Sequence, residues 1–110
     1  MKTLKFRPHL CEQIIAGEKT CTWRLFDDKD LQPGERVEFQ NWETKEPIGE
    51  AVLHTIVTKT LSTLTDEDWE GHERYESNEE MYATYRTYYG DQVGPDTELK
   101  IIDFEFTPKI

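Results

Sequence analysis

A chain of 110 residues can bury one hydrophobic core, and we expect residues 1–110 to form a single domain. Its net charge of −10 opposes the long-range attraction that a broad footprint on duplex DNA requires. Because no apolar run could cross a bilayer and the N-terminus lacks the apolar stretch of a secretory signal, we expect a cytoplasmic protein with no membrane partner.

The acidic excess is confined to one part of the chain. Basic and acidic side chains balance in residues 1–40, so all the net negative charge falls in residues 41–110. This distribution allows a local basic cleft in the N-terminal third. The overall charge favours a small ligand over a long polyanion.

The hydrophobic periodicity predicts strands with short helices between them. In chain order we expect a strand at 2–6, a helix from Pro8 with its apolar stripe over 10–16, strands at 19–25, 36–42 and 48–60, helices beginning after Thr65 and Ser77, and a last strand at 99–106. The 48–60 strand is expected to bend or bulge near Gly49 or in its middle. Strands dominate this order, which is typical of an α+β domain built on a small, partly closed antiparallel β-barrel with short flanking helices.

The segment at residues 17–24, with the sequence GEKTCTWR, carries the most chemistry. Gly17 is placed to end the first helix in the left-handed region. Beyond it, one face of the expected strand carries two hydroxyls and a guanidinium, from Thr20, Thr22 and Arg24. The other face carries the apolar side chains of Cys21, Trp23 and Leu25. A polar row at a helix–strand junction is suited to hold an anionic or hydrogen-bonding ligand.

This sequence resembles the ASCH family, whose small domains belong to the PUA-like superfamily. The resemblance spans nearly the whole chain and rests on the G-x-K-T-x-T-x-R pattern of residues 17–24, the Gly34 turn before a strand, the 64–68 segment, and the first and last elements. It implies a β-barrel with a cleft beside the first helix that receives RNA or an RNA-derived nucleoside.

Bacterial ASCH proteins that hydrolyse 4-acetylcytidine share this pattern, and the likeness implies Lys19 as base, Thr22 as nucleophile and a glutamate as proton donor. An ungapped alignment with the family places His72 at the position of the proton-donating glutamate. Shifting that alignment by one residue selects Glu73 instead, and Glu70 is the other candidate. A base must activate a threonine hydroxyl, and an acid must protonate the leaving amine, so Lys19, Thr22 and Glu73 are chemically sufficient for amide hydrolysis. In an ideal strand Lys19 and Thr22 point to opposite faces, and they converge only if the strand begins after Lys19 or carries a bulge.

Four other residues are candidates for ligand binding. Thr20 and Arg24 share the polar face, His9 lies at the first helix start, and Trp42 could stack on a base. Each of two residues also has a structural alternative. Arg24 could instead form an ion pair with Asp27, Asp28 or a strand neighbour, and Trp42 could pack in the core. The tyrosine stripe that follows Ser77 is more typical of core or interface than of base stacking.

The remaining expectations concern cofactors and rival functions. No two histidines have metal-ligand spacing, and Cys11 and Cys21 lack a C-x-x-C spacing, so we expect no metal, no cofactor and no disulfide. The expected partner is RNA or a modified nucleoside, bound by a monomer. A non-catalytic RNA-binding module is one alternative. A ribonuclease, in which Lys19 and Arg24 stabilise the pentavalent phosphate, is another, and an interaction domain that uses the tyrosine helix is a third.

Overall fold

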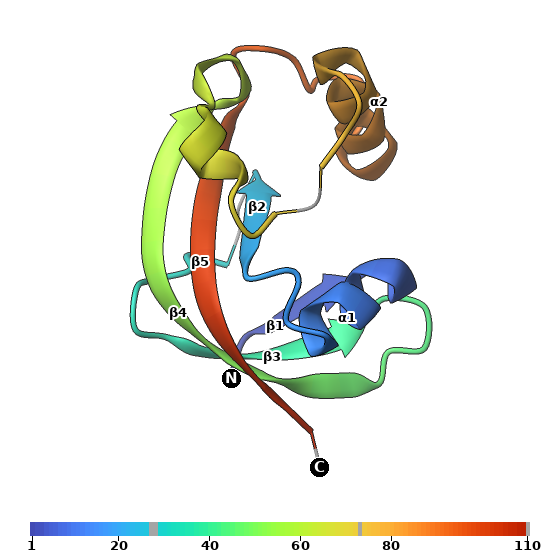
Figure 1. Cartoon of the computed structure of the whole chain (residues 1–110), viewed down its shortest axis with the longest axis vertical. Coiled ribbons are helices and arrows are strands. Elements are labelled where there is room, and N and C mark those ends of the chain that lie inside the picture. Colours follow the sequence, from blue (N-terminus) through green and yellow to red (C-terminus); the bar gives the residue numbers. More distant parts are fainter. Residues whose placement is uncertain (27–28, 73, 110) are drawn as a thin grey trace.

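A curled sheet forms the body of the molecule, in a computed structural model that describes residues 1–26, 29–72 and 74–109 (Figure 1). The strands are β1 (Thr3–Phe6), β2 (Cys21–Leu25), β3 (Arg36–Asn41), β4 (Pro47–Thr60) and β5 (Glu98–Pro108). The helices are α1 (Pro8–Ile15) and α2 (Asn78–Tyr89), with short 3₁₀ helices η1 (Leu61–Thr63) and η2 (Asp66–Trp69). In these described ranges, no helix has the length and apolar character needed to cross a bilayer.

The strand order is β1-β3-β4-β5-β2, so β1 and β2 form the two edges of the sheet. This mixed sheet curls into a half-barrel, which confirms the predicted α+β class and the partly closed barrel. One pairing departs from an antiparallel barrel, because β1 and β3 run parallel. The chain leaves β1 through α1 and β2 before it returns beside β1 as β3, and parallel neighbours require such a crossover.

The end of α1 decides where β2 begins. Gly17 adopts the predicted left-handed conformation, with φ of +81°. The Gly17 amide donates to the Ile14 carbonyl at 3.1 Å, and the Glu18 amide donates to the Gln13 carbonyl at 2.9 Å, which is the Schellman pattern. The Lys19 amide is held by the same Gln13 carbonyl at 3.2 Å, so β2 starts two residues later than the predicted strand at 19–25.

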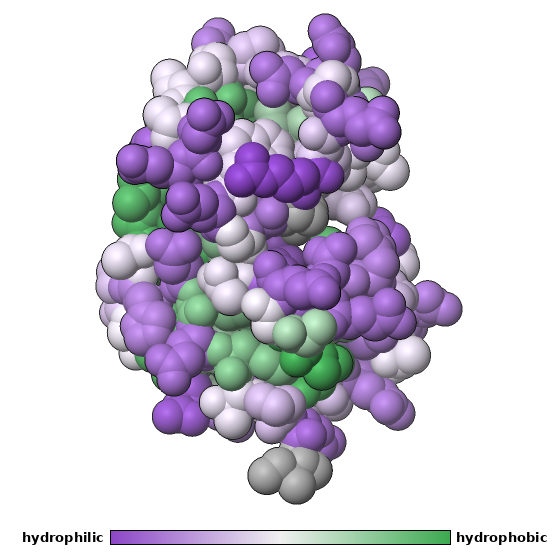
Figure 2. All heavy atoms as spheres, viewed as in Figure 1, coloured by the Kyte–Doolittle hydropathy of each residue, from purple (hydrophilic) through white to green (hydrophobic). Residues whose placement is uncertain are grey.

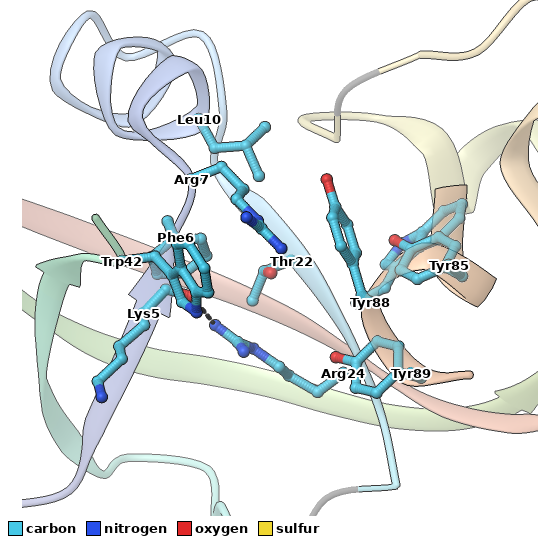
Figure 3. Close-up of a pocket in the computed structure, with 11 residues that line it drawn as sticks. Lys5, Phe6, Arg7, Leu10, Thr22, Arg24, Trp42, Tyr85, Tyr88 and Tyr89 are labelled. Atoms are coloured by element: carbon cyan, nitrogen blue, oxygen red, sulfur yellow. Dashed lines mark hydrogen bonds between the residues drawn. The ribbon is translucent and has the colours of Figure 1, made fainter. Parts of the chain in front are cut away.

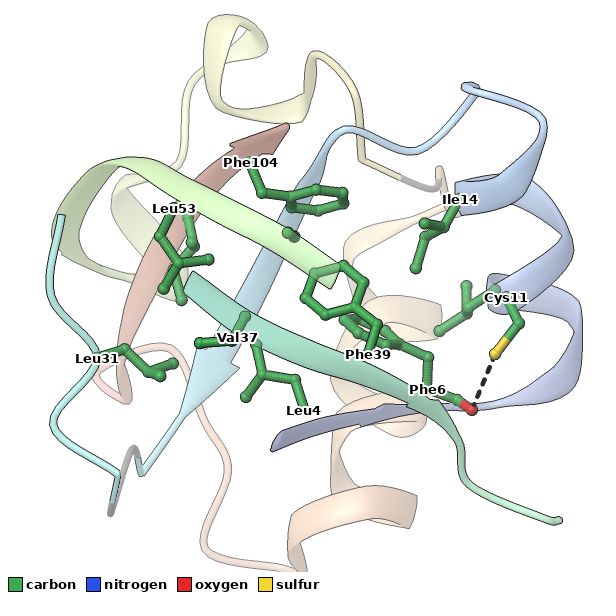
Figure 4. Packing of buried hydrophobic residues seen from close by; sticks show 12 residues of the cluster. Leu4, Phe6, Cys11, Ile14, Leu31, Val37, Phe39, Leu53 and Phe104 are labelled. Atoms are coloured by element: carbon green, nitrogen blue, oxygen red, sulfur yellow. Dashed lines mark hydrogen bonds between the residues drawn. The ribbon is translucent and has the colours of Figure 1, made fainter. Parts of the chain in front are cut away.

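The first hydrophobic core fills the inside of the curled sheet against α1 (Figure 4). Phe39 is fully buried at its centre, with ring centroids 4.6 Å from Phe6 and 4.9 Å from Phe104. The Cys11 thiol donates to the Phe6 carbonyl at 3.4 Å, and burial raises the pKa of this thiol. Cys11 and Cys21 are both buried, and neither forms a disulfide.

The second core lies between α2 and the pair β2–β5. The α2 start agrees with the predicted N-cap, since the Ser77 hydroxyl accepts a hydrogen bond from the Glu80 amide at 3.1 Å. The Glu80 carboxylate accepts from the Glu76 amide at 3.3 Å, where the predicted capping box has it accept from Ser77. Met81 and Tyr85 are the buried residues of the helix.

The long strand β4 carries the predicted irregularities. Its register with β5 shifts between Leu53 and Ile56, and the β3 register shifts opposite Gly49. A side chain at Gly49 would meet the Phe106 ring, since an added Cβ would lie 2.6 Å from Phe106 Cζ. This close approach explains why the bend contains a glycine.

The 3₁₀ helix η2 is tied to β4 by an ion pair. The Asp68 carboxylate lies 2.7 Å from Lys59 Nζ and accepts a hydrogen bond from the Thr65 amide at 2.8 Å. Burial acts to raise the pKa of Asp68, but the hydrogen bonds from Lys59 and Thr65 outweigh it and hold the pKa below its usual value. The pair therefore anchors the connection that leads towards α2.

Candidate functional site

A cavity of about 300 Å³ lies between the two edge strands of the curled sheet, where the half-barrel does not close (Figure 3). Its walls come from the β1 end, β2, the turn after β3 and one face of α2. The lining residues are Lys5, Phe6, Arg7, Leu10, Thr22, Trp23, Arg24, Trp42, Tyr85, Tyr88 and Tyr89. The site is thus built from segments that are far apart in the sequence.

Arg24 links the two edges across this opening. Its guanidinium donates a hydrogen bond to the Lys5 carbonyl oxygen at 3.2 Å and lies 4.9 Å from the Phe6 ring centroid. Thr22 is on the same side of β2 as Arg24 and points into the cavity (Figure 3). The Thr22 residue is 4% exposed, so its hydroxyl belongs to the inner wall.

The polar and apolar faces of β2 lie towards different cores. Thr22 pairs opposite Ile102 of the first core, whereas Trp23 pairs opposite Ile101 of the second core. Trp23 is 3% exposed and its ring stacks on His72 with centroids 3.9 Å apart. The predicted core role of Trp23 is confirmed, and the cavity reaches around the edge strand to this ring.

Arg7 lies between two aromatic rings at the cavity wall (Figure 3). Its guanidinium carbon is 3.9 Å from the Trp42 ring centroid and 5.1 Å from the Tyr88 ring centroid. Trp42 is 45% exposed and Tyr88 is 37% exposed, so both rings remain accessible from outside. The arrangement combines cation–π contacts with flat surfaces on which a planar ligand could stack.

The cavity is basic although the chain is acidic. Lys5, Arg7 and Arg24 line it, and none of the described lining residues is a carboxylate. The balanced charge of residues 1–40 permits this local positive field in a chain of net charge −10. Cations, hydroxyls and aromatic rings therefore define the chemistry of the site.

Solved structures share this architecture. An ASCH domain from Lactobacillus crispatus has a TM-score of 0.72 with this chain, covering 98% of it and 81% of the solved chain at 15% identity. ASCH from Zymomonas mobilis has a TM-score of 0.69, covering 96% and 68% at 19% identity. A DUF984 protein from Enterococcus faecalis has a TM-score of 0.75, covering 91% and 71% at 16% identity.

The chain has the ASCH fold. No protein-family model matches its sequence, and no curated protein matches it significantly. The likeness is therefore one of three-dimensional architecture, which agrees with the fold that the 17–24 pattern implied.

Within this ASCH fold, Lys19 and Thr20 lie apart from the cavity. They line a second hollow with apolar side chains of α1 and β5. Figure 2 shows hydrophobic residues gathered in the lower half of the face that it draws. Lys19 is 2% exposed, and its Nζ donates to the Cys21 carbonyl at 2.7 Å. Both Lys19 and Thr22 are described residues, and no direct hydrogen bond joins their side chains.

The segment after η2 packs against the start of β2. The Gly71 carbonyl accepts hydrogen bonds from the Thr20 amide at 2.8 Å and the Cys21 amide at 3.0 Å. Gly71 has φ of +75°, and a Cβ there would overlap the Thr20 hydroxyl oxygen, so this close approach requires glycine. The adjacent His72 is buried, and its Nε2 lies 3.3 Å from the Tyr85 hydroxyl.

The other predicted residues are placed as follows. Thr22, Arg24 and Trp42 line the cavity together, whereas His9 is exposed on α1 and is not part of the lining. Glu70 is exposed at the end of η2, and Glu73 lies outside the described residues. The structure thus brings three of the predicted residues into one cavity.

Sequence reasoning missed most of the cavity wall. The residues not anticipated as site residues are Lys5, Phe6, Arg7, Leu10, Trp23, Tyr85, Tyr88 and Tyr89. The tyrosine stripe was visible as a helical pattern, but its period does not say which strand it faces. Lys5 and Arg7 can be assigned to the site only when the strand order is known, because β1 and β2 are then seen to be the two edges of the sheet.

Proposed function

We propose that this chain binds RNA, or a modified nucleoside derived from RNA, in the cavity between β1 and β2. The observation that carries the proposal is the combination of accessible aromatic rings with cationic donors in one hollow. Single-stranded RNA is recognised by stacking its bases on aromatic rings, while guanidinium groups meet phosphate and carbonyl oxygens. The resemblance of residues 17–24 to the ASCH pattern supports the same class of ligand.

The size of the cavity supports a single nucleoside unit. A volume of about 300 Å³ is near the lower end of small-molecule sites. The Thr22 hydroxyl and the Arg24 guanidinium supply polar groups at the β2 wall, while Trp42 and Tyr88 supply rings. A planar base with its sugar matches this division into polar and aromatic walls.

Replacing Trp42 tests the stacking surface. We expect Trp42→Ala to weaken binding of a short single-stranded RNA or of cytidine by roughly 5–100-fold, since stacking contributes about 1–3 kcal/mol per base. Isothermal titration calorimetry measures the affinities, and unchanged length of the recovered RNA separates binding from ribonuclease activity. Ile15→Ala is the control, because Ile15 is 55% exposed and lies in the second hollow.

The binding proposal fails if short single-stranded RNA, cytidine and 4-acetylcytidine all show no binding to the folded wild-type protein at millimolar concentration. Equal losses of affinity in Trp42→Ala and Ile15→Ala would also contradict it, because only Trp42 lines the cavity.

Amide hydrolysis is a second candidate function, and the burial of a lysine amine favours it. Lys19 is 2% exposed, and buried lysines are the ones that serve as general bases in enzymes. It lies two residues before the first residue of β2, the strand that brings Thr22 to the cavity. Because β2 begins after Lys19, the two side chains are not held on opposite faces of one ideal strand.

The proposed reaction uses three groups. Lys19 takes the proton of the Thr22 hydroxyl, whose oxygen attacks the acetyl carbon of 4-acetylcytidine. Glu73 protonates the exocyclic nitrogen as the C–N bond breaks, which releases cytidine. Water then hydrolyses the threonine ester to acetate. Lys19 Nζ must leave the Cys21 carbonyl, 2.7 Å away, to act on Thr22.

If this reaction occurs, Lys19→Met is expected to lower turnover of 4-acetylcytidine by about 10²–10⁴-fold, the usual contribution of a general base. Chromatography of cytidine and acetate measures turnover, and circular dichroism checks the fold. Lys2→Met is the matched control, because Lys2 is partly exposed and pairs with Glu35, away from the cavity lining. Absence of cytidine with the wild-type protein would reject hydrolysis and leave the binding proposal intact.

A further inference from the structure

We infer that the cavity favours a phosphate group on its ligand, so that it binds a nucleotide or a nucleotide unit of single-stranded RNA more tightly than the free nucleoside. This inference rests on the proposed function and specifies its substrate class. It starts from the three cationic side chains of the lining, Lys5, Arg7 and Arg24, and from the absence of a carboxylate among the described lining residues.

Three cations outside the cavity are paired with carboxylates. Ion pairs join Lys2 to Glu35 at 3.1 Å, Arg36 to Glu50 at 3.4 Å and Lys59 to Asp68 at 2.7 Å. In the described part of the chain, Lys5 and Arg7 have no carboxylate within 4.0 Å. In a chain with 23 acidic and 13 basic side chains, both cations are therefore available to an anionic ligand of the cavity.

Arg7 retains hydrogen-bonding capacity beside its two ring contacts. A guanidinium carries five N–H donors, and a cation–π contact does not use all of them. Its carbon is 3.9 Å from the Trp42 centroid and 5.1 Å from the Tyr88 centroid. No hydrogen bond from the Arg7 side chain to another described residue occurs. A phosphate accepts hydrogen bonds through all its oxygens and matches such a donor.

The number of phosphates is small. The cavity holds about 300 Å³, and the acidic excess of residues 41–110 opposes a long phosphate track beyond it. Contact with one or two phosphates predicts a slope of about −0.7 to −1.4 when the logarithm of the association constant is plotted against the logarithm of salt concentration.

The experiment compares four ligands by isothermal titration calorimetry: cytidine, cytidine 5′-monophosphate, the trinucleotide CpCpC and inorganic phosphate. We expect the monophosphate or the trinucleotide to bind about tenfold or more tightly than cytidine, because charge-assisted hydrogen bonds are added. The ratio of the affinities for these two ligands shows whether the site prefers the phosphate of a free nucleotide or that of an RNA chain.

Two variants test whether Lys5 and Arg7 cause the preference for phosphorylated ligands. Lys5→Gln and Arg7→Gln should each reduce the ratio of the affinity for a phosphorylated ligand to the affinity for cytidine. Because Lys5 is exposed, its variant keeps the fold. Arg36→Gln removes the same charge outside the cavity and should leave the ratio unchanged.

Equal affinities for cytidine and both phosphorylated ligands would overturn the inference while the proposed function stands. Inorganic phosphate as tight as the monophosphate would also overturn it, because the base would then contribute nothing. Absence of binding by all nucleosides, nucleotides and RNA would instead refute the proposed function itself.

Discussion

Arg24→Gln is expected to weaken ligand binding by roughly 10–100-fold, the effect of losing a hydrogen bond from a charged group. Arg24 contributes a cation to the cavity wall and donates across the opening to the Lys5 carbonyl, 3.2 Å away. Glutamine keeps much of the length of the side chain but removes its charge and its forked donor. The affinity for cytidine 5′-monophosphate, measured by calorimetry, checks this expectation.

Two variants separate the charge of Arg24 from its geometry. Arg24→Lys keeps the charge and should recover only part of the affinity, because an ammonium cannot reproduce the planar fork. Lys100→Gln removes a cation that pairs opposite Arg24 on β5 but does not line the cavity, so it should bind like the wild type. Wild-type affinity in Arg24→Gln would exclude Arg24 from the binding site.

Phe39→Ala is expected to lower the free energy of unfolding by about 3–5 kcal/mol, since it removes the most central ring of the first core. Phe39 is 0% exposed and packs against Phe6, Phe104 and Phe106, with centroids 4.6, 4.9 and 5.7 Å away. These rings join β1, β3 and β5, and the surrounding backbone cannot collapse fully into the space left. Urea denaturation followed by circular dichroism measures the loss.

Phe26→Ala is the matched control for the core variant. Phe26 is 52% exposed and its nearest ring contact is an edge contact with Tyr89 at 5.9 Å, so its loss should change stability by no more than about 0.5 kcal/mol. A similar small change in Phe39→Ala would show that the rings around Phe39 repack without cost, which contradicts the described core.

Local sequence patterns predicted the elements closely. Gly17 ends α1 as expected, Ser77 caps α2, and the alternation of residues 21–25 separates the polar wall from Trp23 in the second core. These features depend on φ/ψ preferences and on hydrogen bonds between residues a few positions apart. Such local interactions can be predicted from the residue types alone. The boundary of β2 differed because the α1 end holds the Lys19 amide, a contact that periodicity does not reveal.

The candidate site was predicted only in part. Thr22, Arg24 and Trp42 were identified from residue type and spacing, and all three line the cavity. His9 is exposed elsewhere on α1, and Lys19 turns to the Cys21 carbonyl. A helix–strand junction indicates that polar groups gather there, but the direction of each side chain depends on the elements packed around it.

The order of strands and helices, the two faces of β2 and the balance of charge in residues 1–40 all follow from local patterns in the chain. Packing between distant segments sets the parallel pairing of β1 with β3, makes β1 and β2 the edges of the sheet, and brings the α2 tyrosines to the cavity. The difference lies in the range of the interactions. Periodicity and capping act over a few residues, whereas the cavity is made by packing between segments separated by most of the chain.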